Sequence, residues 1–179
     1  MSLRTQLQGT GVALVTPFKS NGDVDFDALG KLIDFIINNG VEYVVTLGTT
    51  GETPTLDKQE KLDIINYTYE KVKDRVPVVV GIGGNNTKDV IANLQSYPLD
   101  KAAAVLSASP YYNKPSQEGI FQHYKALAAA SPKPVILYNV PGRTGSNITA
   151  ETTLRLAAVD NIAGIKEASG NMVQCMHIL

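Results

Sequence analysis

Apolar, strand-like segments recur along this chain at nearly constant spacing, and this repeat restricts the possible folds more than any other feature. The segments begin near residues 11, 43, 77, 103, 134 and 162, which gives intervals of 32, 34, 26, 31 and 28 residues. Stretches between them carry apolar residues at helical spacing, for example Leu29, Leu32 and Ile36. The strand-like segments are continuous apolar runs, as expected for parallel strands covered on both faces. The pattern predicts an α/β protein built from βα units.

The expected strands are Gly11–Thr16, Tyr43–Leu47, Pro77–Ile82, Ala103–Ser107, Pro134–Asn139 and Asn161–Ala168. The expected helices start after the capping residues Asp25, Asp57, Asn86 or Thr87, Ser116, Thr149 and Asn171. In the helix after Ser116, His123 is expected on the exposed face. Two architectures fit this order, a doubly wound sheet and a (β/α)8 barrel. Polar and glycine residues follow strands two to five, and a barrel uses many such loops together, so the barrel is favoured.

Composition narrows the class of protein. Of the 179 residues, 44% are hydrophobic and 18% charged, and the net charge of −1 offers no basic excess for a general nucleic-acid binder. The lone cysteine rules out an intrachain disulfide framework and suits a reducing compartment. No apolar run approaches the roughly 20 residues of a membrane span, and the first residues lack the apolar run of a signal peptide. We expect a cytoplasmic protein.

The last expected strand ends in a lysine. Because side chains alternate along a strand, Gly164 and Lys166 point one way and Glu167 the other. We expect this strand to be buried, and burial favours the neutral amine, the form that attacks a carbonyl carbon. A lysine that extends to water or pairs with Glu167 is the alternative at this point.

Other reactive motifs are absent or incomplete. Gly81–Gly84 resembles the start of a dinucleotide fingerprint, but Asn86 occupies the third glycine position. Gly48–Gly51 lacks the following Lys-Ser or Lys-Thr of a P-loop, and no Gly-x-Ser-x-Gly elbow occurs. The two histidines and Cys175 do not have metal-ligand spacing, so no metal site is expected.

Hydroxyl groups and one arginine follow the expected strands. Thr49 and Thr50 follow the second strand, Tyr112 the fourth, and Tyr138 ends the fifth, with Arg143 soon after. Threonine hydroxyls and loop N–H groups can bind the carboxylate of a 2-oxo acid, and a tyrosine hydroxyl can shuttle protons. An arginine can hold a second carboxylate. Each residue alone could equally serve packing or a turn.

Four motifs in this order resemble the dihydrodipicolinate synthase family, a group of pyruvate-dependent class I aldolases, over essentially the whole chain. The motifs are Gly48–Glu52, Pro110–Pro115, Tyr138–Gly145 and Gly164–Ala168. The resemblance implies a (β/α)8 barrel enzyme, a lyase that condenses pyruvate with L-aspartate 4-semialdehyde by an aldol-type step and cyclisation, toward diaminopimelate and lysine. No metal or organic cofactor is implied, because the lysine iminium is itself the electron sink.

The resemblance also implies residue roles. Lys166 forms the Schiff base, Tyr138 is the general acid/base, and Thr49 and Tyr112 complete a proton relay, Tyr112 from a neighbouring subunit of a dimer or homotetramer. Thr50 binds the pyruvate carboxylate, and Arg143 binds that of the semialdehyde. Asn85, Asp89 and Tyr111 suit an allosteric lysine pocket, although Lys58 stands where lysine-sensitive members often have histidine. N-acetylneuraminate lyase or a keto-deoxy-sugar-acid aldolase of the same family is the alternative, and Thr49 and Arg143 favour the synthase.

The chain departs from this family in length. A (β/α)8 barrel needs about 250 residues, and this chain supplies six expected strands. We expect residues 1–179 to be the N-terminal part of one barrel domain, with the remaining strands and a C-terminal helical region absent. By itself such a piece is expected to be neither a stable nor an active monomer, so an inactive fragment is the third alternative.

Overall fold

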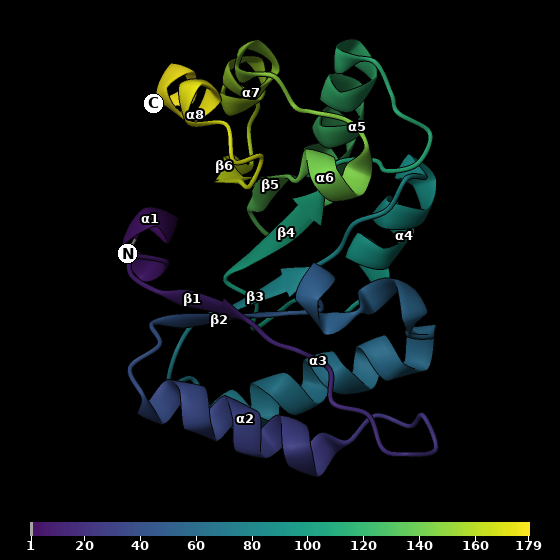
Figure 1. Ribbon diagram of the computed structural model, residues 1–179, viewed down its shortest axis with the longest axis vertical. Coiled ribbons are helices and arrows are strands. Elements are labelled where there is room, and N and C mark those ends of the chain that lie inside the picture. Colours follow the sequence, from purple (N-terminus) through teal and green to yellow (C-terminus); the bar gives the residue numbers. More distant parts are fainter. Residues whose placement is uncertain (1) are drawn as a thin grey trace. The chain divides into compact units, whose positions relative to one another are not determined.

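The computed structural model describes residues 2–179, which divide into two compact units, each with three parallel strands (Figure 1). The first unit comprises Met1–Gly81 and Pro98–Ala104, and the second comprises Ile82–Tyr97 and Val105–Leu179. Each strand is followed by at least one helix, so the expected α/β class and the six βα units are confirmed.

In the first unit, strands pair in the order β1-β2-β3. Its elements are α1 (Leu3–Gln6), β1 (Gly11–Ala13), α2 (Phe26–Asn38), β2 (Tyr43–Thr46), the short 3₁₀ helices η1 (Thr49–Gly51) and η2 (Thr53–Thr55), α3 (Lys58–Val72) and β3 (Val78–Gly81). The side chain of Asp25 caps α2 by accepting from Ala28 N at 2.9 Å. Asp57 and Glu60 form a capping box at the start of α3. These caps orient α2 and α3, which pack side by side (Figure 1).

Gly81 ends β3 where a neighbouring loop comes unusually close. Leu47, directly after β2, has a left-handed backbone with φ of 54°. A Cβ on Gly81 would overlap the Leu47 carbonyl oxygen and lie 2.9 Å from Gly48 N. Gly81 therefore makes room for the turn that leads into η1.

Replacing Gly81 with alanine should destabilise the protein by about 1–3 kcal/mol, since rigid backbone must move to admit the methyl group. The measurement is the free energy of urea unfolding. Gly164→Ala is the matched control, because that strand glycine has no atom within 4 Å of the added Cβ. Equal losses in the two variants would contradict the steric explanation.

In the second unit, strands pair in the order β4-β5-β6. Its elements are α4 (Thr87–Ser96), β4 (Ala104–Ala108), α5 (Gln117–Ala130), β5 (Val135–Asn139), α6 (Pro141–Thr144), α7 (Ala150–Ala157), β6 (Ile162–Glu167) and α8 (Met172–Ile178). The helices pack in sequence, α4 on α5, α5 on α7, and α7 on α8. Ile120, Tyr124 and Leu127 of α5 are fully buried, as their helical spacing predicts.

The structure corrects several expected elements. Strand β1 ends at Ala13 rather than Thr16, because the Thr16 hydroxyl donates to Gly51 O at 2.6 Å and the chain leaves the sheet. Helices α1 and α6 were not among the expected helices. The expectation that the last strand is buried is wrong, because all residues of β6 are half-buried or exposed. Within residues 2–179, β6 pairs only with β5, which leaves its other edge uncovered.

His123 is also placed differently from expectation. Its side chain is buried, with 4% exposed, rather than on the outer face of α5. The Nδ1 atom lies 2.8 Å from the Thr87 hydroxyl, and the ring meets Tyr124 edge-on. Packing of α4 against α5 covers this face, which one helix's sequence does not reveal. Burial lowers the pKa of His123 to about 4.

Acid should therefore destabilise the protein through His123. The unfolded chain takes up a proton near pH 6.5, whereas the folded histidine does so only near pH 4. Between these values the unfolded state binds more protons, so stability falls as pH falls, by about 3 kcal/mol in all. Urea unfolding across this range measures the slope, and His123→Gln should remove this contribution. An unchanged slope in the variant would contradict the assignment.

Candidate active site

Lys166 and Tyr138 lie side by side in the second unit. The register of β5 and β6 places Tyr138 opposite Lys166, so both side chains project from the same face of the sheet. The Lys166 Nζ atom lies 4.5 Å from the centroid of the Tyr138 ring. Tyr138 is buried, with 8% of its side chain exposed. Neighbouring strands thus bring these two residues together.

The environment of Lys166 favours the neutral amine. Its side chain is exposed overall, in contrast to the expected burial, but partial desolvation of the amine lowers the pKa below the ordinary 10.5. The lower pKa leaves more unprotonated amine at neutral pH, which is the nucleophilic form. Pairing with Glu167 is not observed, since the Glu167 carboxylate accepts from Asn139 Nδ2 at 2.9 Å on the other face.

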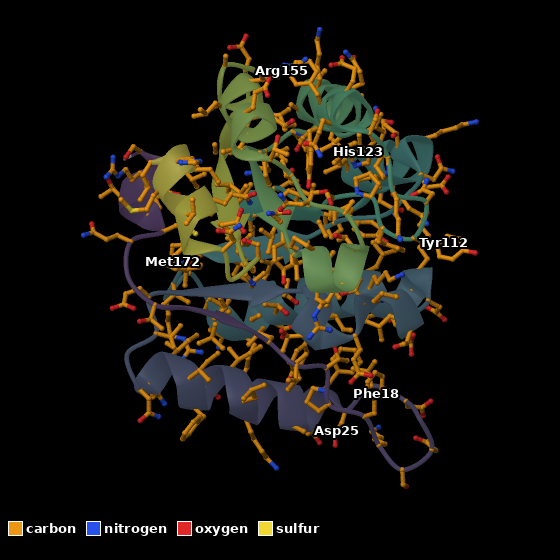
Figure 2. All side chains as sticks on the ribbon, turned by 45° about the horizontal axis from the view of Figure 1, so that its top comes forward. Phe18, Asp25, Tyr112, His123, Arg155 and Met172 are labelled. Atoms are coloured by element: carbon orange, nitrogen blue, oxygen red, sulfur yellow. The ribbon has the colours of Figure 1, made fainter. Side chains whose placement is uncertain are left out.

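Tyr112 and Arg143 come from adjoining segments. Tyr112 N donates to Thr144 O at 3.3 Å, which holds the tyrosine loop against α6, the helix that carries Arg143. Tyr112 has φ of 73°, and 88% of its side chain is exposed, so it projects away from the ribbon (Figure 2). Among residues 2–179, no hydrogen bond joins its hydroxyl to another side chain. Arg143 is likewise exposed.

Thr49 and Thr50 belong to the first unit. Both lie in η1, the turn immediately after β2, with Thr49 half-buried and Thr50 exposed. The Thr53 hydroxyl ties the turn by donating to Leu47 O at 2.7 Å and Gly48 O at 2.9 Å. Thr53 therefore satisfies the turn's carbonyls and leaves the hydroxyls of Thr49 and Thr50 available to a ligand.

The three residues expected at an allosteric site lie in the second unit. Asn85 is half-buried just before α4, and Asp89 is exposed in its first turn. The Asp89 carboxylate accepts from Asn86 Nδ2 at 2.8 Å. Tyr111 follows β4 and is 37% exposed.

Sequence reasoning missed a polar network behind the reactive pair. The network joins the ends of β5 and β6 to α8 and to the segment before α7 through Asn139, Glu167, Gln174 and Asn147. Asn139 is fully buried. Asn139 and Glu167 stand next to Tyr138 and Lys166 in the motifs, and a polar pair at the ends of two apolar strands was the available signal.

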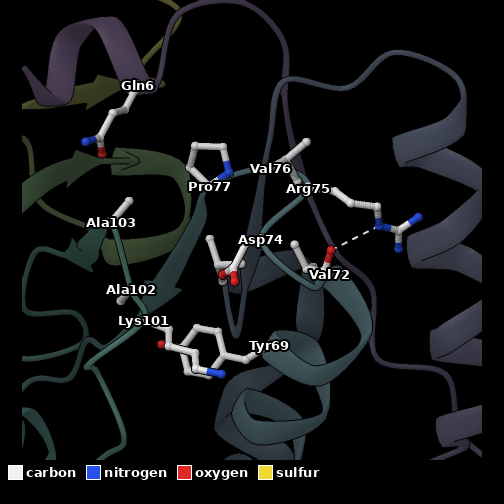
Figure 3. Close-up of a pocket in the computed structure, with 11 residues that line it drawn as sticks. Gln6, Tyr69, Val72, Asp74, Arg75, Val76, Pro77, Lys101, Ala102 and Ala103 are labelled. Atoms are coloured by element: carbon white, nitrogen blue, oxygen red, sulfur yellow. Dashed lines mark hydrogen bonds between the residues drawn. The ribbon is translucent and has the colours of Figure 1, made fainter. Parts of the chain in front are cut away.

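A pocket of about 340 Å³ lies elsewhere, in the first unit (Figure 3). Pro77 and Val78 at the start of β3 line it, with Tyr69, Asp74 and Lys101. Arg75 turns away to donate from Nε to Val72 O at 3.0 Å. No expected site residue lines this pocket, which opens at the amino end of β3 rather than at the carboxyl ends of strands.

Among residues 2–179, no group of three or more His, Cys, Asp or Glu side chains could hold a metal ion. Over the same residues, no helix is long and apolar enough to cross a membrane.

Comparison with known proteins decides the family. The model of the dihydrodipicolinate synthetase family matches residues 6–179. This chain belongs to that family. The resemblance of the four motifs is confirmed, and the chain supplies about six βα units of the family's (β/α)8 barrel.

Individual relatives agree with this membership. The 4-hydroxy-tetrahydrodipicolinate synthase of Parabacteroides distasonis is 55% identical over 174 residues, 97% of this chain and 59% of that protein. The Acinetobacter baumannii dihydrodipicolinate synthase, solved in complex with pyruvate, is 43% identical with a TM-score of 0.91, over 94% of this chain and 58% of that one. The enzyme from Cyanidioschyzon merolae, solved with lysine bound, is 39% identical with a TM-score of 0.90, over 97% and 60%. The chain therefore spans about three-fifths of the length of these relatives.

Proposed function

We propose that the protein containing this chain is a 4-hydroxy-tetrahydrodipicolinate synthase, which condenses pyruvate with L-aspartate 4-semialdehyde. The observation that carries the proposal is the Lys166 amine, with its lowered pKa, 4.5 Å from the Tyr138 ring. Family membership supports the substrates, because relatives at 50–55% identity bear this name. The same chemistry would serve diaminopimelate and lysine biosynthesis.

The proposed reaction begins with an imine. The Lys166 amine adds to the ketone carbon of pyruvate, and loss of water from the carbinolamine gives an iminium ion. Loss of a methyl proton then gives an enamine, whose carbon attacks the semialdehyde's aldehyde carbon. The semialdehyde's own amine displaces Lys166 from the iminium carbon as the ring closes. One water is released overall, and Lys166 returns to the free amine.

The remaining residues have proposed roles at these steps. Tyr138 moves protons during carbinolamine formation and dehydration, with Thr49 and Tyr112 completing the relay. Tyr112 is so exposed that it suits contact with another copy of the chain, as a dimer or homotetramer would provide. Thr50 is assigned to the pyruvate carboxylate and Arg143 to that of the semialdehyde.

The domain organisation, cellular location and regulation of the enzyme are also proposals. The uncovered edge of β6 and the length of the relatives support a single barrel domain to which residues 1–179 contribute the N-terminal part. We propose a cytoplasmic location, which the lone cysteine supports. Asn85, Asp89 and Tyr111 are proposed as a lysine-binding site, and the Cyanidioschyzon merolae relative, solved with lysine bound, supports testing that ligand.

Borohydride trapping tests the proposed function. Pyruvate and sodium borohydride should leave a reduced pyruvyl group on Lys166, located by peptide mass spectrometry, and none on the exposed Lys125. Consumption of L-aspartate 4-semialdehyde in the presence of pyruvate should follow. Absence of the Lys166 adduct would refute the proposal, and cleavage of N-acetylneuraminate to pyruvate and N-acetylmannosamine without condensation would identify a sugar-acid lyase.

A further inference from the structure

A β-bulge lies in β6 just before the reactive lysine. Val135 pairs with Ile162, but the next residue of β5, Ile136, pairs with Gly164. Ala163 is therefore an extra residue without a partner across the ladder. After this point the pairing is regular and places Tyr138 opposite Lys166 and Asn139 opposite Glu167.

The bulge decides which face of the sheet Lys166 occupies. If pairing continued from Val135 and Ile162 without the extra residue, Tyr138 would lie opposite Ile165 and Asn139 opposite Lys166. A one-residue shift turns every later side chain to the other face. The amine would then leave the Tyr138 ring and enter the face that Asn139 occupies.

Asn139 holds the bulged register from the buried side. Its Oδ1 accepts from Ile148 N at 2.9 Å. Since a backbone N–H can only donate, this contact fixes the amide orientation and turns Nδ2 toward acceptors. Nδ2 donates to the two carboxylate oxygens of Glu167 at 3.1 and 2.9 Å and to Asn147 Oδ1 at 2.8 Å.

Glu167 completes the contact from β6. Its carboxylate also accepts from Ser169 N at 2.7 Å and Gln174 Nε2 at 2.8 Å. Partial burial alone would raise the pKa of Glu167, but these donors outweigh it and the pKa is lowered. In the shifted register Glu167 would lie one position beyond Asn139. Its partly buried carboxylate would then lose its hydrogen-bond donors.

We propose that Glu167 and Asn139 are positioning residues that lock the bulged register and so keep the Lys166 amine against Tyr138. The inference rests on the proposed function for its catalytic meaning. The register itself is a property of the second unit, and it can be measured without any substrate.

Two readouts on the protein containing this chain test the proposal. One is the pH dependence of Lys166 labelling by a small amine-reactive reagent, quantified by peptide mass spectrometry. The other is the rate at which the borohydride-trapped pyruvate adduct forms, together with kcat and KM for pyruvate.

The variants Glu167→Gln and Asn139→Asp each disturb the pairing of these two side chains. The first sets an amide against the Asn139 donors, and the second sets a carboxylate against a carboxylate. The double variant restores a donor opposite an acceptor between positions 139 and 167, while the bond from position 139 to Asn147 Oδ1 stays lost. Glu118→Gln on the exposed side of α5 is the matched control.

Each single variant should move the labelling midpoint of Lys166 and slow adduct formation about tenfold to a hundredfold, since small misplacements of a reacting group have effects of this size. The loss should fall on kcat more than on KM, and the double variant should recover part of it. Glu118→Gln should behave as the unaltered protein. Single variants with unchanged labelling and adduct rates, or with losses explained wholly by a smaller folded fraction, would overturn the inference. If the single variants alter Lys166 labelling but the unaltered protein forms no pyruvate adduct, the result would support the register and refute the proposed function.

Discussion

Replacing Lys166 with alanine should abolish the pyruvate adduct and lower turnover by roughly 10⁴-fold or more, since no other group can form the imine in its place. Lys166 lies on an exposed strand, where truncation leaves no buried cavity, so the variant should fold. Peptide mass spectrometry after borohydride treatment measures the first effect, and steady-state turnover with both substrates measures the second.

Two comparisons make this result specific. Lys125→Ala removes an exposed lysine of α5 and should leave turnover and adduct unchanged. Thermal unfolding of both variants should match the unaltered protein within a few degrees. Retention of substantial turnover by Lys166→Ala would show that the reaction does not pass through an imine on this residue.

Tyr138→Phe should lower kcat about 10²–10⁴-fold, the usual loss when a general acid/base is removed. The ring remains, so its contact with the Lys166 amine should persist. Loss of the hydroxyl removes the proton donor for dehydration of the carbinolamine. We therefore expect the pyruvate adduct to form slowly but still to form, in contrast to Lys166→Ala.

Tyr97→Phe provides the matched control for this substitution. Tyr97 is 9% exposed and Tyr138 is 8% exposed, so both changes remove a hydroxyl from a nearly buried ring. Tyr97 ends α4, outside the group of predicted site residues. Similar turnover in the two variants would show that the Tyr138 hydroxyl contributes only to packing.

Much of the candidate site could be predicted from the sequence. Lys166 and Tyr138 were predicted from their positions at the ends of adjacent expected strands, and they are opposite each other in the ladder. Thr49, Thr50, Tyr112 and Arg143 were placed correctly after β2, β4 and β5. Their catalytic roles stay predictions, to be tested by the variants above.

Some features were misjudged because they depend on which elements pack together. His123 was expected to be exposed, but α4 covers that face of α5 and Thr87 reaches its ring. The last strand was expected to be buried, yet within the described residues it has a neighbour on one edge only. Helical and strand periodicity report which face is apolar, but they do not report what lies against it.

The sequence by itself determined the repeat of six βα units, nearly all of the strand positions and the family, because local spacing and short motifs carry that information. The tertiary structure alone decided that Ala163 is a bulge, that Asn139 and Glu167 meet behind the sheet, and that the Lys166 amine therefore lies over the Tyr138 ring. Strand register arises from hydrogen bonds between segments far apart in the chain, and a single extra residue reverses the face that a side chain occupies.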